Sequence, residues 1–283
     1  MVILVTGAQG QLGQALKAKA PLYEGAQFYF AGSGEADITS EQSLAAAFSK
    51  IKPDFCINAA AYTAVDKAES EPEKAYAVNA AGAKNLAAIC HKQGCTLIHL
   101  STDFVFDGTK QTPYTEEDTP NPQSVYGTTK LEGEQEIQKA LEHYFIVRTS
   151  WVYSQYGHNF MKTMLRLGAE RDRLSVVNDQ AGTPTNANDL AEILLQICKS
   201  GSKAYGIYNY SNEGTATWYD FAKKIFEVNN ISIALTPIPT AAYPTPAKRP
   251  AYSVLDKSKI KQHFGLGIKH WEISLEDINN DLL

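Results

Sequence analysis

The chain has 283 residues, of which 44% are apolar and 20% are charged, and its formal net charge is −5. This length supports one or two domains with a large core. The acidic balance argues against nucleic acid as a partner, and no apolar run is long enough to span a membrane. The four cysteines form neither a CxxC pair nor a metal-ligand spacing, and the first residues lack a basic, apolar leader. These features predict a cytoplasmic protein.

The first half of the sequence alternates strand and helix patterns. Short apolar runs predict strands at 2–6, 27–31, 54–58, 96–101 and 144–149. Helical spacing predicts helices around 12–16, from a capping box at 39–42 to about residue 51, at 71–93 and around residue 126. This alternation predicts an α/β fold built as a Rossmann-type, doubly wound parallel sheet with helices on both faces.

The second half has helical patterns at 159–169, 187–199, 218–228 and 271–282, separated by short strands and loops. Five of the 12 prolines fall within 237–250, which predicts an extended loop. We expect a smaller C-terminal α/β domain here. The predicted division assigns residues 1–150 and roughly 186–212 to the Rossmann domain, and residues 151–185 and 213–283 to the smaller one.

A glycine turn follows the first predicted strand. Gly7, Gly10 and Gly13 form the pattern GxxGxxG between that strand and the first helix. Such glycines let the backbone approach a pyrophosphate, and the helix N-terminus offers NH groups to its oxygens. A plain strand-to-helix turn is the alternative. The second strand ends at 30–33 without the acidic residue that favours NAD. We therefore expect NADPH as the cofactor, with NADH as a second acceptable one.

Tyr126 and Lys130 are four residues apart, which on a helix places both side chains on one face. A nearby ammonium group stabilises a phenolate and so lowers the pKa of the phenol. Such a pair can deliver a proton near neutral pH. Because the same spacing is also typical of an ordinary surface helix, the rest of the sequence must decide whether the pair is catalytic.

Several stretches resemble one known group of enzymes. The glycine turn, the segments 58–61 and 101–103, and the pair Tyr126/Lys130 resemble the extended short-chain dehydrogenase/reductase superfamily. Five further stretches narrow the resemblance to the dTDP-4-dehydrorhamnose reductase family: 58–66, 101–108, 148–153, 178–185 and 242–250. The resemblance covers residues 1 to about 282. It implies reduction of the 4-keto group of dTDP-4-dehydro-L-rhamnose by NADPH, the last step of dTDP-rhamnose biosynthesis.

The same resemblance implies roles for individual residues. Tyr126 would protonate the 4-keto oxygen, Thr102 would hydrogen-bond that oxygen, and Lys130 would bind the nicotinamide ribose and lower the pKa of Tyr126. The implied cofactor-binding residues are Gly7, Gly10, Gln11, Leu12, Gly13, Asp37, Ile38, Ala60, Ala61, Tyr62, Thr63, Tyr126 and Lys130. The implied substrate-binding residues are Thr102, Asp103, Tyr126 and Trp151.

Other roles compete for three of these positions, and a fourth residue, Arg249, has two alternative roles outside the assigned set. Asp37 could simply open the turn before a helix, and Trp151 could belong to the core. Asp103 could cap a turn or form an ion pair. Arg249 could grip a diphosphate or be a solvated loop charge, so we do not assign it to the site.

Two departures from related enzymes limit the chemistry. Related dehydratases have a glutamate where this chain has Phe104, so elimination lacks an acid–base pair. Some family members have a glutamate after the third glycine that helps bind Mg²⁺ at a dimer contact, whereas this chain has Gln14 there. We therefore expect no metal, and either a monomer or a homodimer, with a nucleotide sugar as partner. A 4-epimerase and a non-catalytic NADP-binding regulatory subunit are the competing interpretations.

Overall fold

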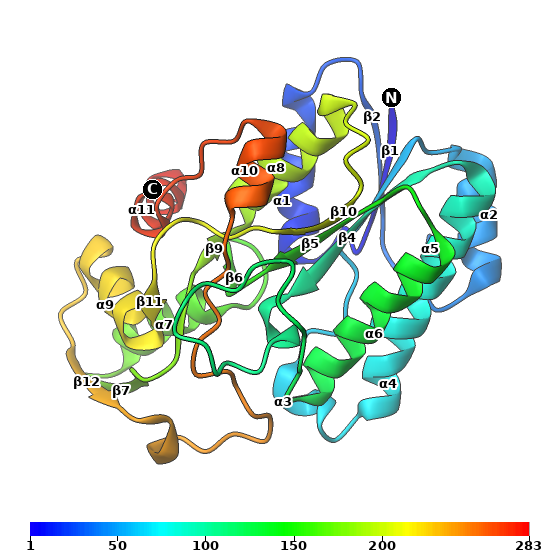
Figure 1. The fold of residues 1–283 in the computed structure, drawn as a ribbon. Coiled ribbons are helices and arrows are strands. Elements are labelled where there is room, and N and C mark those ends of the chain that lie inside the picture. The colour runs from blue at the N-terminus through cyan, green and yellow to red at the C-terminus, as the bar shows by residue number, and fades with distance from the viewer. Residues whose placement is uncertain (283) are drawn as a thin grey trace.

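A six-stranded sheet forms the centre of the larger part of the molecule. The structure is a computed structural model, and it describes residues 1–282. The strands are β1 (Val2–Thr6), β2 (Gln27–Ala31), β3 (Phe55–Asn58), β4 (Thr96–Thr102), β5 (Tyr144–Thr149) and β10 (Gly206–Asn209). They lie in the order β10-β5-β4-β3-β1-β2, and each pair of neighbours is parallel (Figure 1). The strand order reverses beside β1, and ligands of such sheets bind at the carboxyl ends of the strands near this point.

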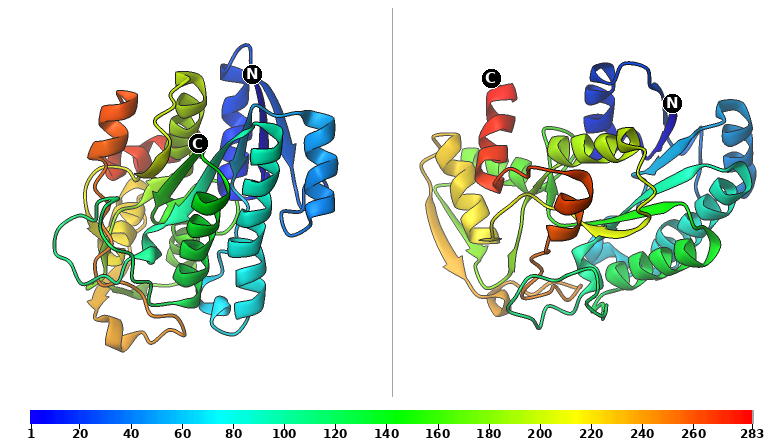
Figure 2. Two further views of the ribbon diagram at one scale, coloured as in Figure 1. Left: turned by 45° about the vertical axis from the view of Figure 1, so that its right-hand side comes forward. Right: turned by 45° about the horizontal axis from the view of Figure 1, so that its top comes forward.

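Helices cover both faces of the sheet, as Figures 1 and 2 show. One face carries α1 (Gln11–Lys19), α8 (Ala187–Ser200) and α10 (Ser258–Phe264), and the other carries α2 (Glu41–Ile51), α5 (Gly82–Gln93) and α6 (Val125–Ala140). Successive residues of β1 alternate between the two faces of the sheet: Ile3 and Val5 pack beneath α1 and α8, whereas Leu4 packs beneath α2 and α5. This alternation follows from the two-residue repeat of a strand. The predicted α/β fold class is confirmed.

A second core lies beyond the carboxyl ends of the sheet. It contains three helices, α7 (Phe160–Glu170), α9 (Trp218–Val228) and α11 (Trp271–Leu282), and three short strand pairs. The pairs are β6 (Val152–Tyr153) with β9 (Thr185–Asn186), β7 (Arg173–Val177) with β12 (Ala234–Ile238), and β8 (Ala181–Gly182) with β11 (Ala216–Thr217). The chain enters this region after β5 and returns to the sheet through α8 and β10.

Some elements differ from the sequence prediction. The expected helix at 71–93 is divided into α4 (Pro72–Tyr76), a π-helical turn η2 (Ala77–Ala81) and α5. The capping box expected at 39–42 is wrong, because Ser40 is the N-cap of α2 and accepts a hydrogen bond from the backbone N of Ser43 (3.2 Å). Strand β12 and a 3₁₀ turn η4 (Thr240–Ala242) occupy the start of the expected proline-rich loop.

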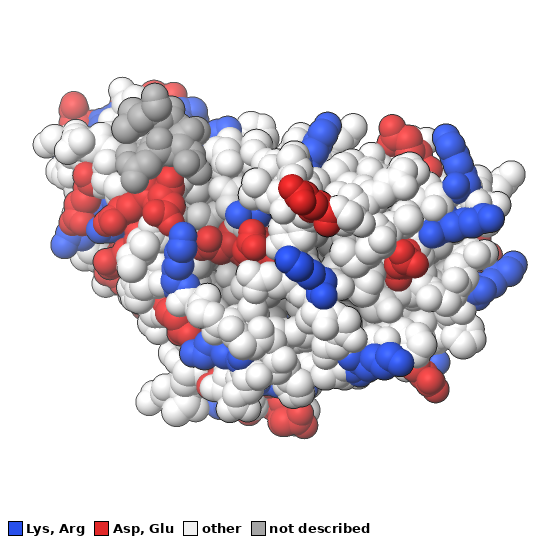
Figure 3. Space-filling model, turned by 90° about the horizontal axis from the view of Figure 1, so that it is seen from above, with Lys and Arg blue, Asp and Glu red and all other residues white. Residues whose placement is uncertain are grey.

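The remaining short elements are helix α3 (Val65–Ala68) and the 3₁₀ turns η1 (Ala20–Leu22) and η3 (Asp103–Val105). Among the helices of residues 1–282, none has the length and apolarity that a membrane span requires. Acidic and basic side chains are interspersed on the face seen in Figure 3.

Candidate active site

The glycine turn at the carboxyl end of β1 leaves no room for side chains. Gly7 has a φ of +68°, and a Cβ atom on it would lie 2.5 Å from the backbone N of Ala60. A Cβ atom on Gly13 would lie 2.5 Å from the carbonyl oxygen of Gly7. Gly10 is the N-cap of α1, and no side chain of the described residues caps this helix. The first NH groups of α1 therefore remain available to an anion, as a dinucleotide pyrophosphate requires.

Gln11 and Leu12, which follow the turn, direct their side chains away from it. The Gln11 Oε1 atom accepts hydrogen bonds from Ser154 Oγ and Asn159 Nδ2, both at 2.9 Å. Leu12 is buried in the core beneath α1 and α8. These two residues can therefore offer backbone NH groups to a ligand, while the Gln11 side chain joins α1 to the start of α7.

The residues expected near an adenine lie after β2. Asp37 Oδ1 accepts hydrogen bonds from the backbone N and the hydroxyl of Thr39 (2.9 and 2.8 Å), so this carboxylate shapes the turn before α2. Ile38 is buried and packs against Gly82, where a Cβ atom would lie 2.8 Å from its Cδ1 atom. Asn85 Nδ2 donates to the Ile38 carbonyl oxygen (3.1 Å). These hydrogen bonds agree with the alternative role of Asp37, in which it forms the turn before the helix.

Glu35 is an acidic residue that the sequence analysis missed. Its Oε2 atom accepts a hydrogen bond from the backbone N of Gly32 (2.7 Å), immediately after β2. This exposed carboxylate lies at the strand end where dinucleotide-binding proteins hold the adenosine ribose. A pattern search that looks for the acid in the strand itself does not find it.

The segment after β3 is held by two amide side chains. Asn58 Oδ1 accepts from the backbone N of Ala60 (3.1 Å), and Asn79 Oδ1 accepts from the backbone N of Tyr62 (2.8 Å). Asn79 lies in the π-helical turn, and its Nδ2 atom donates to the Tyr62 carbonyl oxygen and to Thr129 Oγ1 (3.1 and 3.2 Å). These hydrogen bonds fix Ala60 and Tyr62, two of the four expected channel residues at 60–63.

Thr102, Asp103 and Tyr126 come together at the carboxyl end of β4. The Thr102 hydroxyl donates to Asp103 Oδ1 (3.1 Å) and accepts from the backbone N of Phe104 (3.2 Å). The Phe104 ring packs edge-on against Tyr126, with 5.6 Å between centroids. Gly127 has no side chain to obstruct this contact, since a Cβ atom there would overlap the Phe104 carbonyl oxygen. The start of α6 can therefore approach the segment that follows β4.

Burial controls the acidity of these groups. Asp103 is buried, and burial raises its pKa from 3.8 to about 6, although the Ser253 and Thr102 hydroxyls oppose the rise. Burial likewise raises the pKa of Tyr126 to about 12; the Thr102 hydroxyl lowers this pKa, and the charge of Asp103 raises it further. Lys130, which we expected to lower the pKa of Tyr126, is not among the groups that shift this pKa.

The Lys130 ammonium group is directed toward β4. Its Nζ atom donates to the Leu100 carbonyl oxygen (2.6 Å) and lies 3.3 Å from Nε2 of His99. Burial lowers the pKa of Lys130 to about 8, and the Glu134 carboxylate opposes this change. Glu134 itself is paired with Arg148 in a buried ion pair, with 2.7 Å between Oε2 and Nη2. The sequence analysis missed His99, Glu134 and Arg148 because each lies within an apparently regular strand or helix.

Trp151 has a different setting from the other expected substrate residues. It follows β5 with a φ of +45°, a conformation that non-glycine residues seldom adopt and that often marks a functional site. Its indole ring stacks on Trp218 of α9 at 3.6 Å and covers Gly182, where a Cβ atom would lie 2.7 Å from the ring. Trp151 therefore joins the sheet to the second core, and the alternative of a packing role accounts for these contacts.

Known proteins resemble this chain over its whole length. The family model described as "RmlD substrate binding domain" matches residues 1–283. The dTDP-4-dehydrorhamnose reductase of Sinorhizobium fredii is 44% identical, and the alignment covers 97% of this chain and 95% of that protein. The chain belongs to the dTDP-4-dehydrorhamnose reductase family. The family resemblance predicted from the sequence is confirmed.

Two solved structures of this family agree with the fold. The dTDP-4-dehydrorhamnose reductase of Clostridium acetobutylicum has a TM-score of 0.95 at 42% identity, covering 100% of this chain and 99% of that one. The reductase of Bacillus anthracis, in complex with NADP, has a TM-score of 0.94 at 38% identity, covering 99% of each chain. The Rossmann-type fold is therefore shared with both proteins.

An ion pair connects the proline-rich segment to α3. Arg249, in the proline-rich segment, contacts Asp66 of α3 with both terminal nitrogens, at 2.9 and 2.8 Å. The Arg249 guanidinium holds the pKa of Asp66 below its usual value. Because both terminal nitrogens contact Asp66, Arg249 links the proline-rich segment to α3. The two roles considered for Arg249 from the sequence, diphosphate binding and a solvated charge, did not include this contact.

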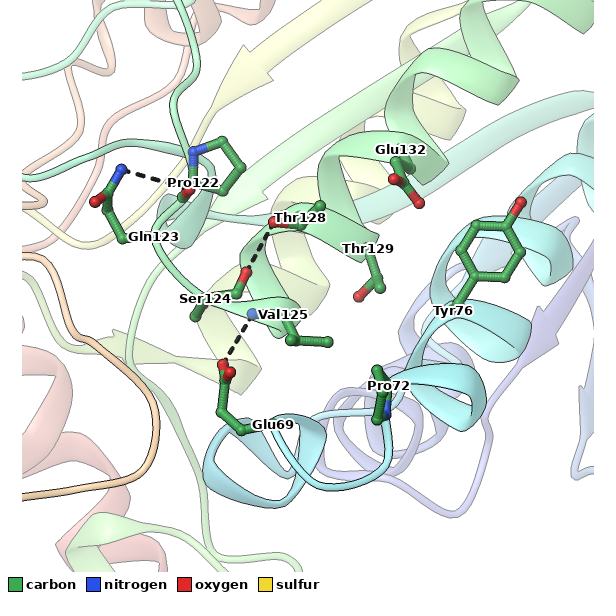
Figure 4. A pocket seen from close by; sticks show the side chains of 10 residues that line it. All are labelled: Glu69, Pro72, Tyr76, Pro122, Gln123, Ser124, Val125, Thr128, Thr129 and Glu132. Carbon is green, nitrogen blue, oxygen red and sulfur yellow. Dashed lines mark hydrogen bonds between the residues drawn. The ribbon is translucent and has the colours of Figure 1, made fainter.

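A hollow in the described residues lies apart from these groups. Figure 4 shows that it is bordered by α4, the segment before α6 and the outer side of α6. Its volume is about 530 Å³. Its lining residues are Glu69, Pro72, Tyr76, Pro122, Gln123, Ser124, Val125, Thr128, Thr129 and Glu132. None of the expected catalytic residues lines it, since Tyr126 and Lys130 project from another side of α6.

Proposed function

We propose that this protein reduces the 4-keto group of dTDP-4-dehydro-L-rhamnose to give dTDP-L-rhamnose, with NADPH as the reductant. This is the last step of dTDP-rhamnose biosynthesis. The observation that carries the proposal is the meeting of two hydroxyl groups, those of Thr102 and Tyr126, at the carboxyl end of β4. The glycine turn, in which a Cβ atom on Gly7 or Gly13 would overlap the backbone, follows β1 at the same edge of the parallel sheet. The names and lengths of the aligned relatives support it.

The residues present fit a bound NADPH, which supplies a hydride to the keto carbon. The uncapped start of α1 offers NH groups to the pyrophosphate, and we propose that Gly7, Gly10, Gln11, Leu12 and Gly13 bind there. Asp37 and Ile38 would lie beside the adenine, and residues 60–63 beside the rest of the cofactor. The NADP complex of the Bacillus anthracis relative supports this choice. The Glu35 carboxylate can accept a ribose hydroxyl, which favours some use of NADH as well.

Tyr126 is the proposed acid. With a pKa of about 12, its phenol is fully protonated at neutral pH, so it can donate to an alkoxide, which is a stronger base. The O–H bond of Tyr126 breaks, a new O–H bond forms on the sugar oxygen, and the phenolate remains. The Thr102 hydroxyl donates a hydrogen bond to the same oxygen as negative charge develops on it. Lys130, Asp103 and Trp151 complete the proposed set as cofactor and sugar contacts.

Phe104 distinguishes reduction from elimination. The side chain at this position is an aromatic ring packed against Tyr126, so it provides neither an acid nor a base. We propose that residues 1–150 with roughly 186–212 bind the cofactor, and that residues 151–185 and 213–283 bind the sugar nucleotide. A cytoplasmic location and a monomeric or homodimeric state belong to the same proposal.

The substitution Tyr126→Phe tests the proposal. We expect NADPH oxidation with dTDP-4-dehydrorhamnose to fall about 10²- to 10⁴-fold, the usual contribution of a general acid, while NADPH binding stays nearly intact. The matched control is Tyr76→Phe, since Tyr76 is 51% exposed and borders the hollow behind α6. Unchanged turnover in Tyr126→Phe would remove Tyr126 as the acid. Net NADPH oxidation by the natural protein separates a reductase from an epimerase and from a non-catalytic binder.

A further inference from the structure

A buried histidine lies between the glycine turn and the proposed catalytic lysine. His99 is 1% exposed and lies in the middle of β4. Its neighbour in the parallel register is Asn58 of β3, and Lys130 of α6 approaches it from above the sheet. Both partners contact the imidazole ring directly, Asn58 at Nδ1 and Lys130 at Nε2. The protonation of this ring therefore bears on the state of Lys130.

The hydrogen bonds of Asn58 determine which ring nitrogen of His99 carries a proton. The backbone N of Ala60 can only donate, so the Asn58 atom 3.1 Å from it is the oxygen. This oxygen also lies 2.7 Å from the Thr6 hydroxyl. The amide nitrogen of Asn58 consequently faces Nδ1 of His99 at 2.9 Å and donates to it. Because Nδ1 is an acceptor, the proton of the neutral ring is on Nε2.

This tautomer directs a donor at Lys130. The Nε2–H group of His99 points to Nζ of Lys130 at 3.3 Å. An ammonium group has three hydrogens and no lone pair, so it would oppose another donor, whereas a neutral amine accepts. The hydrogen bond from Nζ to the Leu100 carbonyl oxygen is available to both forms of the lysine. The contacts around Nζ are therefore complementary to the neutral amine.

The other charged groups around Lys130 are already paired. Glu134, one helical turn further along α6, accepts from Arg148 Nε and Nη2 of β5 at 3.0 and 2.7 Å and from the Ser101 hydroxyl of β4. Tyr126, one turn earlier on α6, is a neutral phenol at ordinary pH. His99 is neutral as well, since burial alone already holds its pKa well below its usual value, whichever form Lys130 takes. The Glu134 charge thus favours the ammonium form only in part.

We propose that His99 is a positioning residue that donates a hydrogen bond from its Nε2–H group to Lys130, favours the neutral amine of this lysine over the ammonium form in the free protein, and makes NADPH binding take up a proton. The inference rests on the proposed function, because it assumes that Lys130 contacts the cofactor. The anionic cofactor stabilises the ammonium form, so the amine gains a proton from solvent as the ligand binds. In this step the neutral amine of Lys130 and one proton from solvent combine to give one ammonium group.

Calorimetry of NADPH binding in buffers of different ionisation enthalpy counts this proton. With a free-protein pKa of about 8 for Lys130, the natural protein should take up roughly 0.7 proton per NADPH at about pH 8.5. In His99→Gln, the amide oxygen can turn toward the ammonium group and raise the pKa of Lys130, so uptake should fall clearly below that of the natural protein, although burial still lowers this pKa. Lys130→Met, which removes the titrating amine, should abolish it. The matched control is His91→Gln on the exposed side of α5, which should retain the full uptake.

A histidine that only fills space would leave proton uptake unchanged in His99→Gln, and that result would overturn the proposal. The natural protein alone provides a second test that does not depend on folding of a variant. Its NADPH affinity should fall toward tenfold per pH unit as the pH rises above about 8, and a flat profile would also overturn the proposal. Failure of the proposed function is separate: it appears as absent turnover of the dTDP sugar while proton uptake on NADPH binding persists.

Discussion

Replacement of Asp103 by Asn should stabilise the protein at neutral pH. Asp103 is 2% exposed, and its carboxylate is ionised above about pH 6 in a setting that lacks a cationic partner among the groups that shift its pKa. An amide of the same shape can still accept the hydrogen bond from Thr102 that Oδ1 now accepts. The substitution therefore removes the buried charge while it preserves the packing at the carboxyl end of β4.

The size of the effect follows from the pKa of Asp103. Burial raises this pKa from 3.8 to about 6, and each pKa unit corresponds to roughly 1.36 kcal/mol. Above about pH 6 the carboxylate is charged in both the folded and the unfolded states, so its burial costs the folded state about 3 kcal/mol. Below about pH 3 the carboxyl is neutral in both states, and the cost disappears. The gain from Asp103→Asn should follow the same curve.

Urea unfolding followed by tryptophan fluorescence measures this gain. At about pH 7.5 the free energy of unfolding of Asp103→Asn should exceed that of the natural protein by about 3 kcal/mol, and near pH 4 the difference should fall below about 1 kcal/mol. Asp118→Asn is a suitable control, because Lys110 lowers the pKa of Asp118 and the loss of its charge should destabilise the protein. An equal gain for Asp103→Asn at both pH values, or a loss at pH 7.5, would refute the electrostatic reasoning.

Two further predictions concern the core and the glycine turn. Glu134→Ala leaves the buried Arg148 guanidinium without its carboxylate, so the free energy of unfolding in urea should fall by about 3–5 kcal/mol. Its control, Glu136→Ala on the outer side of α6, should lower that free energy by less than about 1 kcal/mol. Similar losses for both variants would contradict this prediction. Gly13→Ala places a Cβ atom 2.5 Å from the Gly7 carbonyl oxygen and should weaken NADPH binding in a fluorescence titration, whereas Gly34→Ala, with nothing within 4 Å among the described residues, should not. Equal affinity in both glycine variants would show that the turn tolerates a side chain.

The sheet could be predicted from local patterns because its strands have clear ends. Gly7 ends β1, Pro53 precedes β3 and Gly94 precedes β4, so each apolar run was bounded by a residue that interrupts regular structure. The π-helical turn at 77–81 had no such signal, since alanine, valine and asparagine occur in ordinary helices. Helix α10, with only seven residues, was too short for a periodic pattern to emerge.

The chemical roles at the site were less accessible to sequence reasoning. The Tyr126/Lys130 spacing correctly indicated a shared helix, but the direction of the lysine depends on the Leu100 carbonyl oxygen and on His99, which belong to β4. The acidity of Asp103 depends on how deeply the carboxyl end of β4 is covered. Such burial is a property of the assembled layers, so no local pattern of residue types encodes it.

The position of β10 at the edge of the sheet has a consequence for synthesis of the chain. Residues 150–205 separate β5 from β10, although the two strands are hydrogen-bonded neighbours. At about 5–20 residues per second, a ribosome needs roughly 3 to 11 s to make the intervening segment. During this interval β5 presents unpaired NH and carbonyl groups along an apolar strand, which is a template for pairing with another chain. The newly made N-terminal half is therefore exposed to aggregation until β10 emerges and pairs with β5.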